Sequence, residues 1–323
     1  MTIISLHITN TSLMAVADSL ISNNHPARVL AEDKKIVIFE PRYRIPRVSL
    51  GRFNYFSDFT AGNFGIAYAG TLSLVSTTLN AFQDVVRNCM FLDRDSTEKG
   101  KPRVYWQRNF EGRFKDCSYD DSYNFGSEEL PPITVSMLAF ILISVCQKTC
   151  LDFRKNAMKQ PDLQFLLFGE EMVGYQRRVR CDVVKILGFE GDELRYEHSS
   201  VLPNHVAMIG DKMVIDELTR VIRKDTKFSA PPNEQQVSGG RATSPDLDGY
   251  EVDIKEQRTE AWANRRRQVL KKCTLEFIDK ETNTVGGDVS VAEIGWTRPL
   301  RLSIIRKEHI EEEIQRLSKA LSS

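Results

Sequence analysis

The sequence predicts an α+β protein in which antiparallel sheets carry helices on their outer faces. Strand-like and helix-like segments come in groups instead of alternating one by one, which argues against a doubly wound parallel sheet. No glycine-rich phosphate loop of the G-x-x-x-x-G-K-[ST] or G-x-G-x-x-G type is present. With 323 residues, the chain is long enough to bury a substantial core.

The N-terminal half opens with two short apolar runs, rich in β-branched residues, on either side of the turn-prone tetrapeptide at 9–12. These runs predict a hairpin of strands 3–8 and 13–17. Further strands are expected at 36–39 and 63–70. A helix is expected at 71–91, because apolar residues recur there at helical spacing.

The C-terminal half predicts two more groups of strands, each followed by helices. A helix at 134–159 precedes strands at 163–169, 179–189, 193–198 and 205–210, with a hairpin turn at 190–192. Helices are expected next at 212–223 and 251–271, strands at 273–280, 286–295 and 300–305, and a terminal helix at 307–321. We interpret the chain as one domain, 1–323, with insertions at about 41–62 and 93–132, the second irregular, and a mobile loop at about 229–250.

The amino-acid composition excludes several classes of function. Lys and Arg total 44 and Asp and Glu total 44, so no net field favours nucleic acid or an anionic membrane. The six cysteines and five histidines show no metal-ligand or disulfide spacing, which indicates reduced cysteines and no metal site. The first dozen residues lack a secretory pattern, and the apolar run 133–146 is too short to span a bilayer. We therefore expect a soluble, cytoplasmic protein.

The start of the chain carries the strongest chemical signal. If Met1 is removed, Thr2 presents a hydroxyl and a free α-amine on one residue. A threonine hydroxyl needs a base within hydrogen-bond reach, and an α-amine, which titrates near about 8, can be that base. A strand that begins at Ile3 would hold this terminus in place.

Two charged residues are candidates to act together with Thr2. Asp18 lies 16 residues and Lys34 32 residues after it. If both converge on Thr2, the lysine stabilises negative charge on the threonine oxygen and the aspartate keeps the lysine charged and oriented. Spacing favours Lys34, while a shift of one residue would bring Lys35 into the site instead.

Thr2 with its strand, the segment VADSL around Asp18, and DKK before an apolar strand resemble the proteasome β-subunit family of N-terminal-nucleophile hydrolases, which includes the HslV peptidase and the Anbu proteins. The stretch GIAYAGTLSLVSTTLNAF is similar to the strand–glycine–helix segment of that family. The block from 181 to 218 is similar to its second sheet and following helix, and TVGGDVSVAEI to its glycine-containing return. The segments 41–62 and 93–132 have no obvious counterpart.

The resemblance implies a four-layer αββα sandwich of two antiparallel sheets and a threonine-type peptidase or amidase. It assigns Thr2 as nucleophile, Asp18 and Lys34 as its charged partners, and the Gly70 amide as oxyanion donor. It implies no cofactor, a peptide or protein substrate, assembly into a homo-oligomeric ring or helical barrel, and an ATP-dependent unfoldase as partner.

The sequence also departs from the family pattern. A supporting serine is missing where the chain reads Gly210-Asp211-Lys212, and an aspartate–serine pair has no match at 282–285. Each candidate also has an ordinary structural interpretation, as a strand-end carboxylate, solvated lysines or a turn glycine. The alternative is therefore a catalytically inactive scaffold that binds a protein partner through its 93–132 insertion.

Overall fold

In the computed structural model, the described residues are 2–24, 27–32, 34–94, 100–107, 112, 114, 119, 123–157, 160–173, 176–224, 248–280, 286–295 and 298–322. They contain two five-stranded antiparallel sheets. Sheet I has the order β14 (Val206–Gly210), β1 (Ile3–Ile8), β2 (Leu13–Asp18), β15 (Val289–Gly295) and β16 (Arg298–Ile305). Sheet II has the order β13 (Glu193–Ser200), β12 (Gln176–Glu190), β11 (Leu163–Val173), β8 (Phe64–Gly70) and β5 (Ile36–Phe39).

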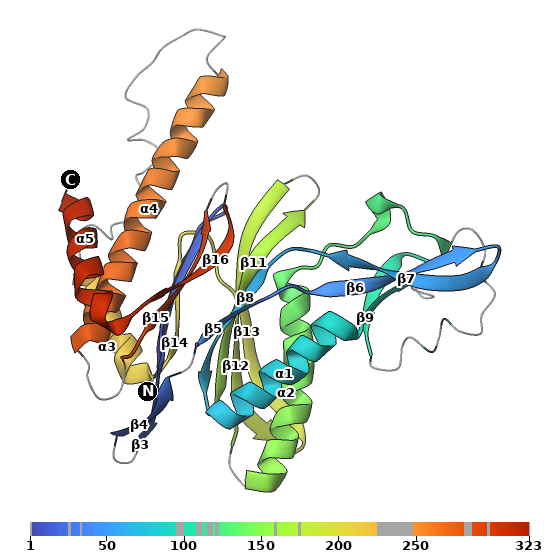
Figure 1. Cartoon of the computed structure of the whole chain (residues 1–323), viewed down its shortest axis with the longest axis horizontal. Helices are drawn as coiled ribbons and strands as arrows, with labels where there is room; N and C mark the ends of the chain where they lie inside the picture. Colours follow the sequence, from blue (N-terminus) through green and yellow to red (C-terminus); the bar gives the residue numbers. More distant parts are fainter. Residues whose placement is uncertain are drawn as a thin grey trace.

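The helices cover the outer faces of the two sheets (Figure 1). Sheet II carries α1 (Leu72–Asn88) and α2 (Val135–Ala157). Sheet I carries α3 (Lys212–Lys224), α4 (Asp248–Lys280) and α5 (Ile310–Ser322). This arrangement confirms the predicted four-layer sandwich of two antiparallel sheets.

Three apolar layers hold the four structural layers together, since each sheet buries both of its faces. Phe82 of α1 and Phe165 of sheet II belong to the outer layer under α1 and α2. Leu6 and Leu166 belong to the layer between the two sheets. Leu270 of α4 belongs to the layer under α3, α4 and α5.

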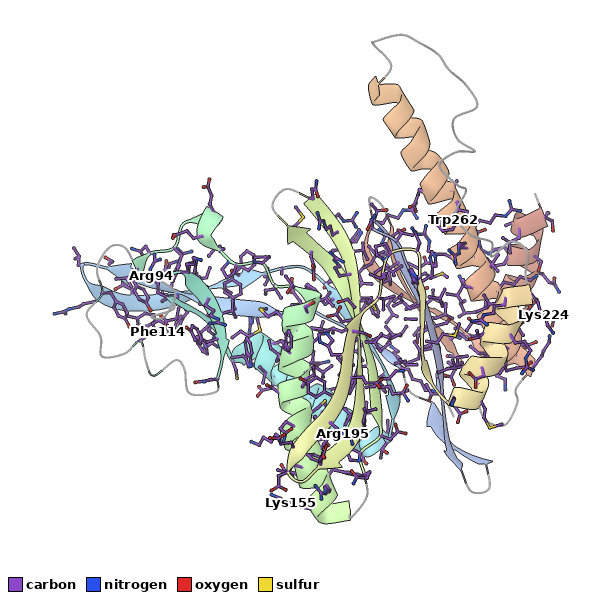
Figure 2. The ribbon with its side chains drawn as sticks, turned by 180° about the vertical axis from the view of Figure 1, so that it is seen from behind. Arg94, Phe114, Lys155, Arg195, Lys224 and Trp262 are labelled. Carbon is purple, nitrogen blue, oxygen red and sulfur yellow. The ribbon has the colours of Figure 1, made fainter. Side chains whose placement is uncertain are left out.

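The two predicted insertions form a third sheet that projects from the sandwich (Figure 1). Its strands are β10 (Pro102–Trp106), β9 (Met90–Arg94), β6 (Arg42–Ser49) and β7 (Arg52–Thr60), in that order. We call this sheet and its aromatic side chains the arm; Figure 2 labels Arg94 and Phe114 within it. The ring of Phe114 is buried among the arm's phenylalanines and tyrosines. The prediction of an irregular 93–132 segment was wrong for β10 and for the 3-10 turn η3 (Ser127–Glu129), because aromatic packing orders a segment of polar composition.

Two smaller features complete the element order. β3 (Leu20–Asn24) and β4 (Ala27–Glu32) form a separate two-stranded hairpin, and a 3-10 turn, η6 (Lys307–His309), precedes α5. The predicted hairpin turn at 190–192 is confirmed, since β12 ends at Glu190 and β13 starts at Glu193.

The predicted strand at 273–280 was wrong, because these residues continue α4. Leu270, Cys273 and Ile278 are buried at helical spacing on the face that packs over sheet I. Residues 248–250 of the predicted mobile loop already belong to α4, and 229–247 lie outside the described residues.

Within the described part of the chain, α2 is the single helix that is long and apolar enough to cross a membrane by length and composition. Its apolar residues Leu138, Ile141 and Leu142 are fully buried against the sandwich, as is typical of a core helix. The five described cysteines are buried and unbridged.

Polar side chains line part of the contact between α4 and β1. Ser5 and Thr274 share a hydrogen bond of 2.9 Å between their hydroxyl oxygens. His7, two residues along the same strand, is 0% exposed. Burial, together with the charges of Arg266 and Arg267, lowers the pKa of its imidazole from 6.5 to about 3.

Because His7 is buried in its neutral form, we expect the protein to lose stability on mild acidification. The folded state holds this imidazole neutral, whereas the unfolded chain binds a proton near pH 6.5, so stability is complete above that pH and is lost as the pH falls toward 3. The slope contributed by one such group is about 1.4 kcal/mol per pH unit. Urea unfolding between pH 7.5 and 5 should give a steeper loss for the wild type than for His7→Gln, and parallel slopes would contradict the assignment.

Candidate active site

The peptide group between Thr2 and Ile3 is held from both sides. The carbonyl oxygen of Thr2 accepts a hydrogen bond of 3.0 Å from the backbone N–H of Asp211. The N–H of Ile3 donates to Oδ1 of Asp18 at 3.0 Å. Because the Thr2 Cα belongs to this peptide plane, it lies within about 5 Å of the carboxylate. Thr2 itself is partly buried.

The hairpin explains how Asp18 reaches this position. β1 and β2 pair antiparallel with Ile4 opposite Ala17, so the end of β2 returns to the start of β1. The turn closes through a hydrogen bond of 2.8 Å from the N–H of Thr9 to the carbonyl of Ser12. The predicted hairpin is confirmed, and it places the carboxylate beside the beginning of the chain's first strand.

Asp18 forms a buried ion pair with Lys35. The Lys35 Nζ lies 2.8 Å from Asp18 Oδ1, and the two side chains are 4% and 0% exposed. Burial raises the pKa of the Asp18 carboxyl above its ordinary 3.8. The Lys35 charge and hydrogen bond, and then the backbone N–H groups of Ile3 and Gly286, oppose that rise and favour the carboxylate.

Lys35 reaches Asp18 from the opposite sheet. Its carbonyl accepts a hydrogen bond of 3.1 Å from the N–H of Tyr68 on β8, which anchors the lysine backbone to sheet II. Its side chain crosses to Asp18 at the end of β2 in sheet I. The ion pair therefore joins the two sheets at the point where the Thr2 backbone is held.

Lys34, which the spacing favoured, does not take this position. Its side chain is exposed, and its carbonyl accepts a hydrogen bond of 3.0 Å from the Tyr68 hydroxyl. The Lys35 side chain is buried beside Asp18, whereas the side chain of Lys34 faces solvent. The structure brings Lys35 to Asp18, the alternative that the sequence had left open.

Two strand–glycine–helix turns meet at this corner. Gly70 ends β8 with φ +127°, and Gly210 ends β14 with φ +125°, a region that disfavours side chains. A Cβ at Gly210 would collide with the carbonyl oxygen of Thr2, and one at Gly70 would collide with the carbonyl oxygen of Asp162. Both positions therefore require glycine.

Gln164 links the two turns. It lies opposite Ala69 in the pairing of β11 with β8. Its side-chain oxygen accepts from the Gly210 N–H at 3.2 Å, and its amide nitrogen donates to the Gly210 carbonyl at 3.4 Å. Gly210 in turn pairs with Ile3. Gly70 thus lies at the same end of the sandwich as Thr2, while its role as oxyanion donor stays a prediction.

Two buried oxygen atoms are available for a further hydrogen bond. Among the described residues, neither Asp18 Oδ2 nor Ser19 Oγ has a hydrogen-bond partner. A buried polar atom without a partner is costly, which makes it a natural acceptor for an additional donor such as an ammonium or hydroxyl group. Asp18 can therefore hold a donor on Oδ2 while Oδ1 stays engaged with Lys35 and Ile3.

The structure adds positioning residues that the sequence analysis missed. In the sequence, Asp211 stands out only as part of a departure from the family pattern. In the structure its N–H donates to the carbonyl oxygen of Thr2. Its carboxylate accepts a hydrogen bond of 2.9 Å from the N–H of Met213, at the start of α3. The helix-start signal of an aspartate after glycine could have shown this role. Gln164 gave no sequence signal, since its partner lies in another sheet. Residues 282–285, where the sequence offers no match for a second supporting pair, lie outside the described residues.

The solved structures that are similar to this chain include two Anbu proteins. One is a Gly-1 mutant of Anbu from Hyphomicrobium sp. strain MC1, with a TM-score of 0.48, 11% identity, and coverage of 100% of this chain and 95% of that chain. The other is Anbu, an ancestral beta-subunit, from Yersinia bercovieri, with a TM-score of 0.44, 10% identity and the same coverage. No protein-family model and no curated protein matches the sequence. Likeness of this degree carries no argument about the site, which rests on its own geometry.

The ion pair predicts unequal effects for the two adjacent lysines. Lys35→Met leaves Asp18 as an uncompensated buried carboxylate and should destabilise the fold by about 3–5 kcal/mol. Lys34→Met changes an exposed side chain and should cost less than about 1 kcal/mol. Urea unfolding of the two variants measures the difference, and equal destabilisation would contradict the pairing.

Proposed function

We propose that the protein is an N-terminal threonine hydrolase that cleaves peptide or amide bonds. The observation that carries this proposal is the buried Asp18–Lys35 ion pair, whose carboxylate also accepts from the N–H that follows Thr2. Such a pair, set within a few ångströms of a partly buried threonine, matches the arrangement expected for activating a hydroxyl nucleophile.

In the proposed mechanism, removal of Met1 exposes the α-amine of Thr2. This amine accepts the proton of the Thr2 hydroxyl as Oγ1 attacks the substrate carbonyl. The Lys35 ammonium stabilises negative charge that develops near the threonine oxygen, and Asp18 holds the ammonium in place. The free Oδ2 of Asp18 can orient the α-amine when it is protonated.

The remaining steps follow from acyl transfer. The Gly70 N–H is proposed to donate to the oxyanion of the tetrahedral intermediate, since Gly70 lies at the same end of the sandwich. The α-ammonium then returns its proton to the leaving amine, and water hydrolyses the acyl-threonine ester. Protonation of the amine at low pH removes the base, so activity is expected to fall as the pH drops below the amine pKa.

Assembly belongs to the proposal as well. Within the described sheets, β14 pairs only with β1, so its outer edge is open. Leu202 and Met213, just before and just after this strand, are 62% and 78% exposed. Exposed apolar side chains beside an open strand edge are compatible with a homo-oligomer. We extend the proposal to a cytoplasmic oligomer supplied with substrate by an unfoldase.

The alternative is an inactive scaffold that binds a protein partner through its arm. The arm supports this alternative because it projects from the sandwich and exposes Leu50 (96%), Tyr55 (60%) and Trp106 (37%). The two functions differ at the first residue: retention of Met1 in protein purified from its native host would block the α-amine and favour the scaffold.

A threonine-directed epoxyketone tests the hydrolase directly. Intact-mass analysis should show a chain that begins at Thr2 and takes up one equivalent of label, and Thr2→Ala should take up none. Lys35→Gln should lower the labelling rate by about 100-fold or more, as expected when a charge that stabilises the transition state is lost. The matched variant Lys34→Gln should label at the wild-type rate. Equal labelling of wild type and Thr2→Ala would exclude Thr2 as the nucleophile.

A further inference from the structure

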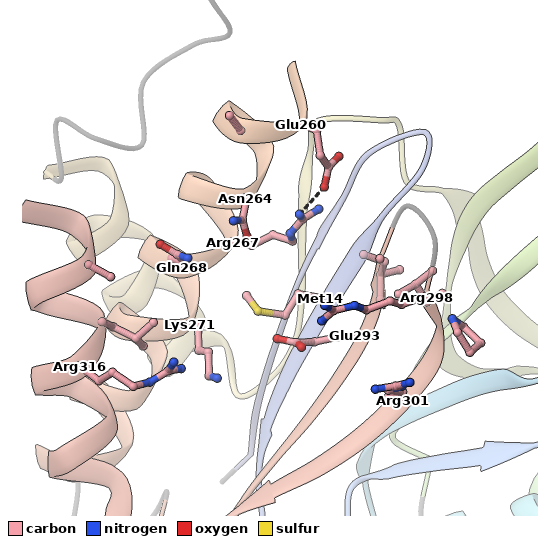
Figure 3. A pocket seen from close by; sticks show the side chains of 17 residues that line it. Met14, Glu260, Asn264, Arg267, Gln268, Lys271, Glu293, Arg298, Arg301 and Arg316 are labelled. Atoms are coloured by element: carbon pink, nitrogen blue, oxygen red, sulfur yellow. Dashed lines mark hydrogen bonds and ion pairs between the residues drawn. The ribbon is translucent and has the colours of Figure 1, made fainter. Parts of the chain in front are cut away.

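A second site lies on the outer side of sheet I, away from Thr2. A cavity of about 530 Å³ opens between α4, α5 and the β15–β16 hairpin (Figure 3). Five of its lining residues are cationic: Arg267 and Lys271 on α4, Arg298 and Arg301 on β16, and Arg316 on α5. We call this cavity the basic groove. Its volume is within the range of ligand sites in proteins, about 300–1,000 Å³.

The helix cations of the groove already have acidic partners. Arg267 pairs with Glu260 at 2.6 Å. A single carboxylate, Glu313, holds both Lys271 at 2.8 Å and Arg316 at 2.6 Å. These ion pairs keep the cationic side chains of α4 and α5 in place along one wall of the groove.

The two cationic residues on β16 differ from those on the helices, because they have no acidic partner among the described residues. Arg298 and Arg301 are exposed, and within the described part of the chain neither side chain has a hydrogen-bond or ion-pair partner. The third nearby carboxylate, Glu293, lies opposite Arg301 in the β15–β16 register without an ion pair between them. With all five cations and these three carboxylates charged, the groove keeps two positive charges, and its open guanidinium groups suit carboxylates.

The floor of the groove is apolar. Met14, Ile294 and Leu317 line it and are themselves at most 3% exposed. Figure 3 shows Met14 between the α4 wall and the β15–β16 hairpin, which carries Glu293 on β15 and Arg298 on β16. A ligand that fits both features has apolar side chains for the floor and acidic groups for Arg298 and Arg301.

The groove also borders an open strand edge. β16 is the last strand of sheet I and pairs, among the described strands, only with β15. Its outer backbone groups can accept an extended peptide as an additional strand. Side chains of such a peptide would alternate between the two faces of the sheet, and those on the helix side would meet Arg301 and the groove.

We propose that the basic groove and the β16 edge together bind an extended acidic peptide that carries both carboxylate and apolar side chains on the face turned toward the groove. A peptide is favoured over a phosphate chain or nucleic acid for three reasons. The excess of two positive charges is small for a polyanion, and Glu260 and Glu293 within the groove repel closely spaced phosphates. A phosphate ligand would also leave the apolar floor uncovered.

The basic groove is separate from the proposed active site. Met14 precedes Asp18 by four residues along β2, so the two ends of the strand lie about 13 Å apart. The inference therefore does not depend on Thr2 chemistry, and Thr2→Ala protein should bind the peptide with unchanged affinity.

Fluorescence anisotropy with the labelled peptide acetyl-Val-Thr-Glu-Thr-Val-Thr-Glu-amide, in which the valines and glutamates share one face of an extended strand, tests the proposal on the full chain. The double variant Arg298→Glu/Arg301→Glu should weaken binding by about tenfold or more, and Arg298→Gln/Arg301→Gln by a smaller factor. Arg195→Glu is the control, because Arg195 is also exposed but lies on β13, far from Trp262 and the α4 wall (Figure 2). A peptide with Lys in place of Glu should bind the wild type less tightly and the double-Glu variant more tightly.

Three outcomes would overturn the proposal. The first is equal peptide affinity for wild type and both double variants. The second is an Arg298- and Arg301-dependent affinity for pyrophosphate or a short oligonucleotide that exceeds the affinity for the peptide, which would assign the groove to phosphate. The third is a change of sedimentation coefficient in the double variants without peptide, which would assign the groove to a contact between copies of the chain. Thermal unfolding of each variant confirms that the comparison is made between folded proteins.

Discussion

The fold and its candidate chemistry both depend on one buried ion pair, between Asp18 in sheet I and Lys35 beside sheet II. Two opposite charges taken out of water cost several kcal/mol each unless geometry and further hydrogen bonds compensate them. Here the Lys35 ammonium and the backbone N–H of Ile3 both donate to Oδ1 of the carboxylate and offset part of that cost. The same carboxylate oxygen that neutralises Lys35 also holds the N–H after Thr2. An ion pair that is costly to bury thus links the first strand to the interface between the sheets. Packing alone does not explain why charged residues occupy this position.

The same backbone arrangement occurs twice near this ion pair, once in each sheet. In each sheet a strand ends at a positive-φ glycine whose missing side chain lets the carbonyl before the neighbouring strand approach closely: Thr2 before β1 and Asp162 before β11. The next N–H, of Asp211 or Thr71, then donates to that same carbonyl, at 3.0 Å and 3.2 Å. The two sheets therefore present the starts of two inner strands, β1 and β11, to one corner of the molecule. The turn at Thr2 differs from the turn at Asp162 because the Asp18–Lys35 ion pair lies beside it.

Local patterns predicted most of the sandwich, and non-local contacts decided the rest. The hairpin, α1, α2 and the β12–β13 turn followed from periodicity and turn residues near in sequence. The sequence of 273–280 predicts a strand because its β-branched and aromatic residues also suit a sheet, whereas the structure continues α4 through it and packs it against β1. The choice between Lys34 and Lys35 depends on which of two adjacent side chains reaches Asp18 in the other sheet. Gln164 and the third sheet of the arm depend on partners far away along the chain, so no local signal could reveal them.

The central claim is that Asp18 and Lys35 act as one unit on Thr2, and a double-mutant cycle on the rate of Thr2 acylation tests it most directly. The rate constant for epoxyketone labelling would be measured for wild type, Asp18→Asn, Lys35→Met and the double variant. If the pair acts as one unit, each single change lowers the rate about as much as both together, so the effects are strongly non-additive. Rates that stay at the wild-type value in the single variants, or effects that simply multiply in the double variant, would contradict the account.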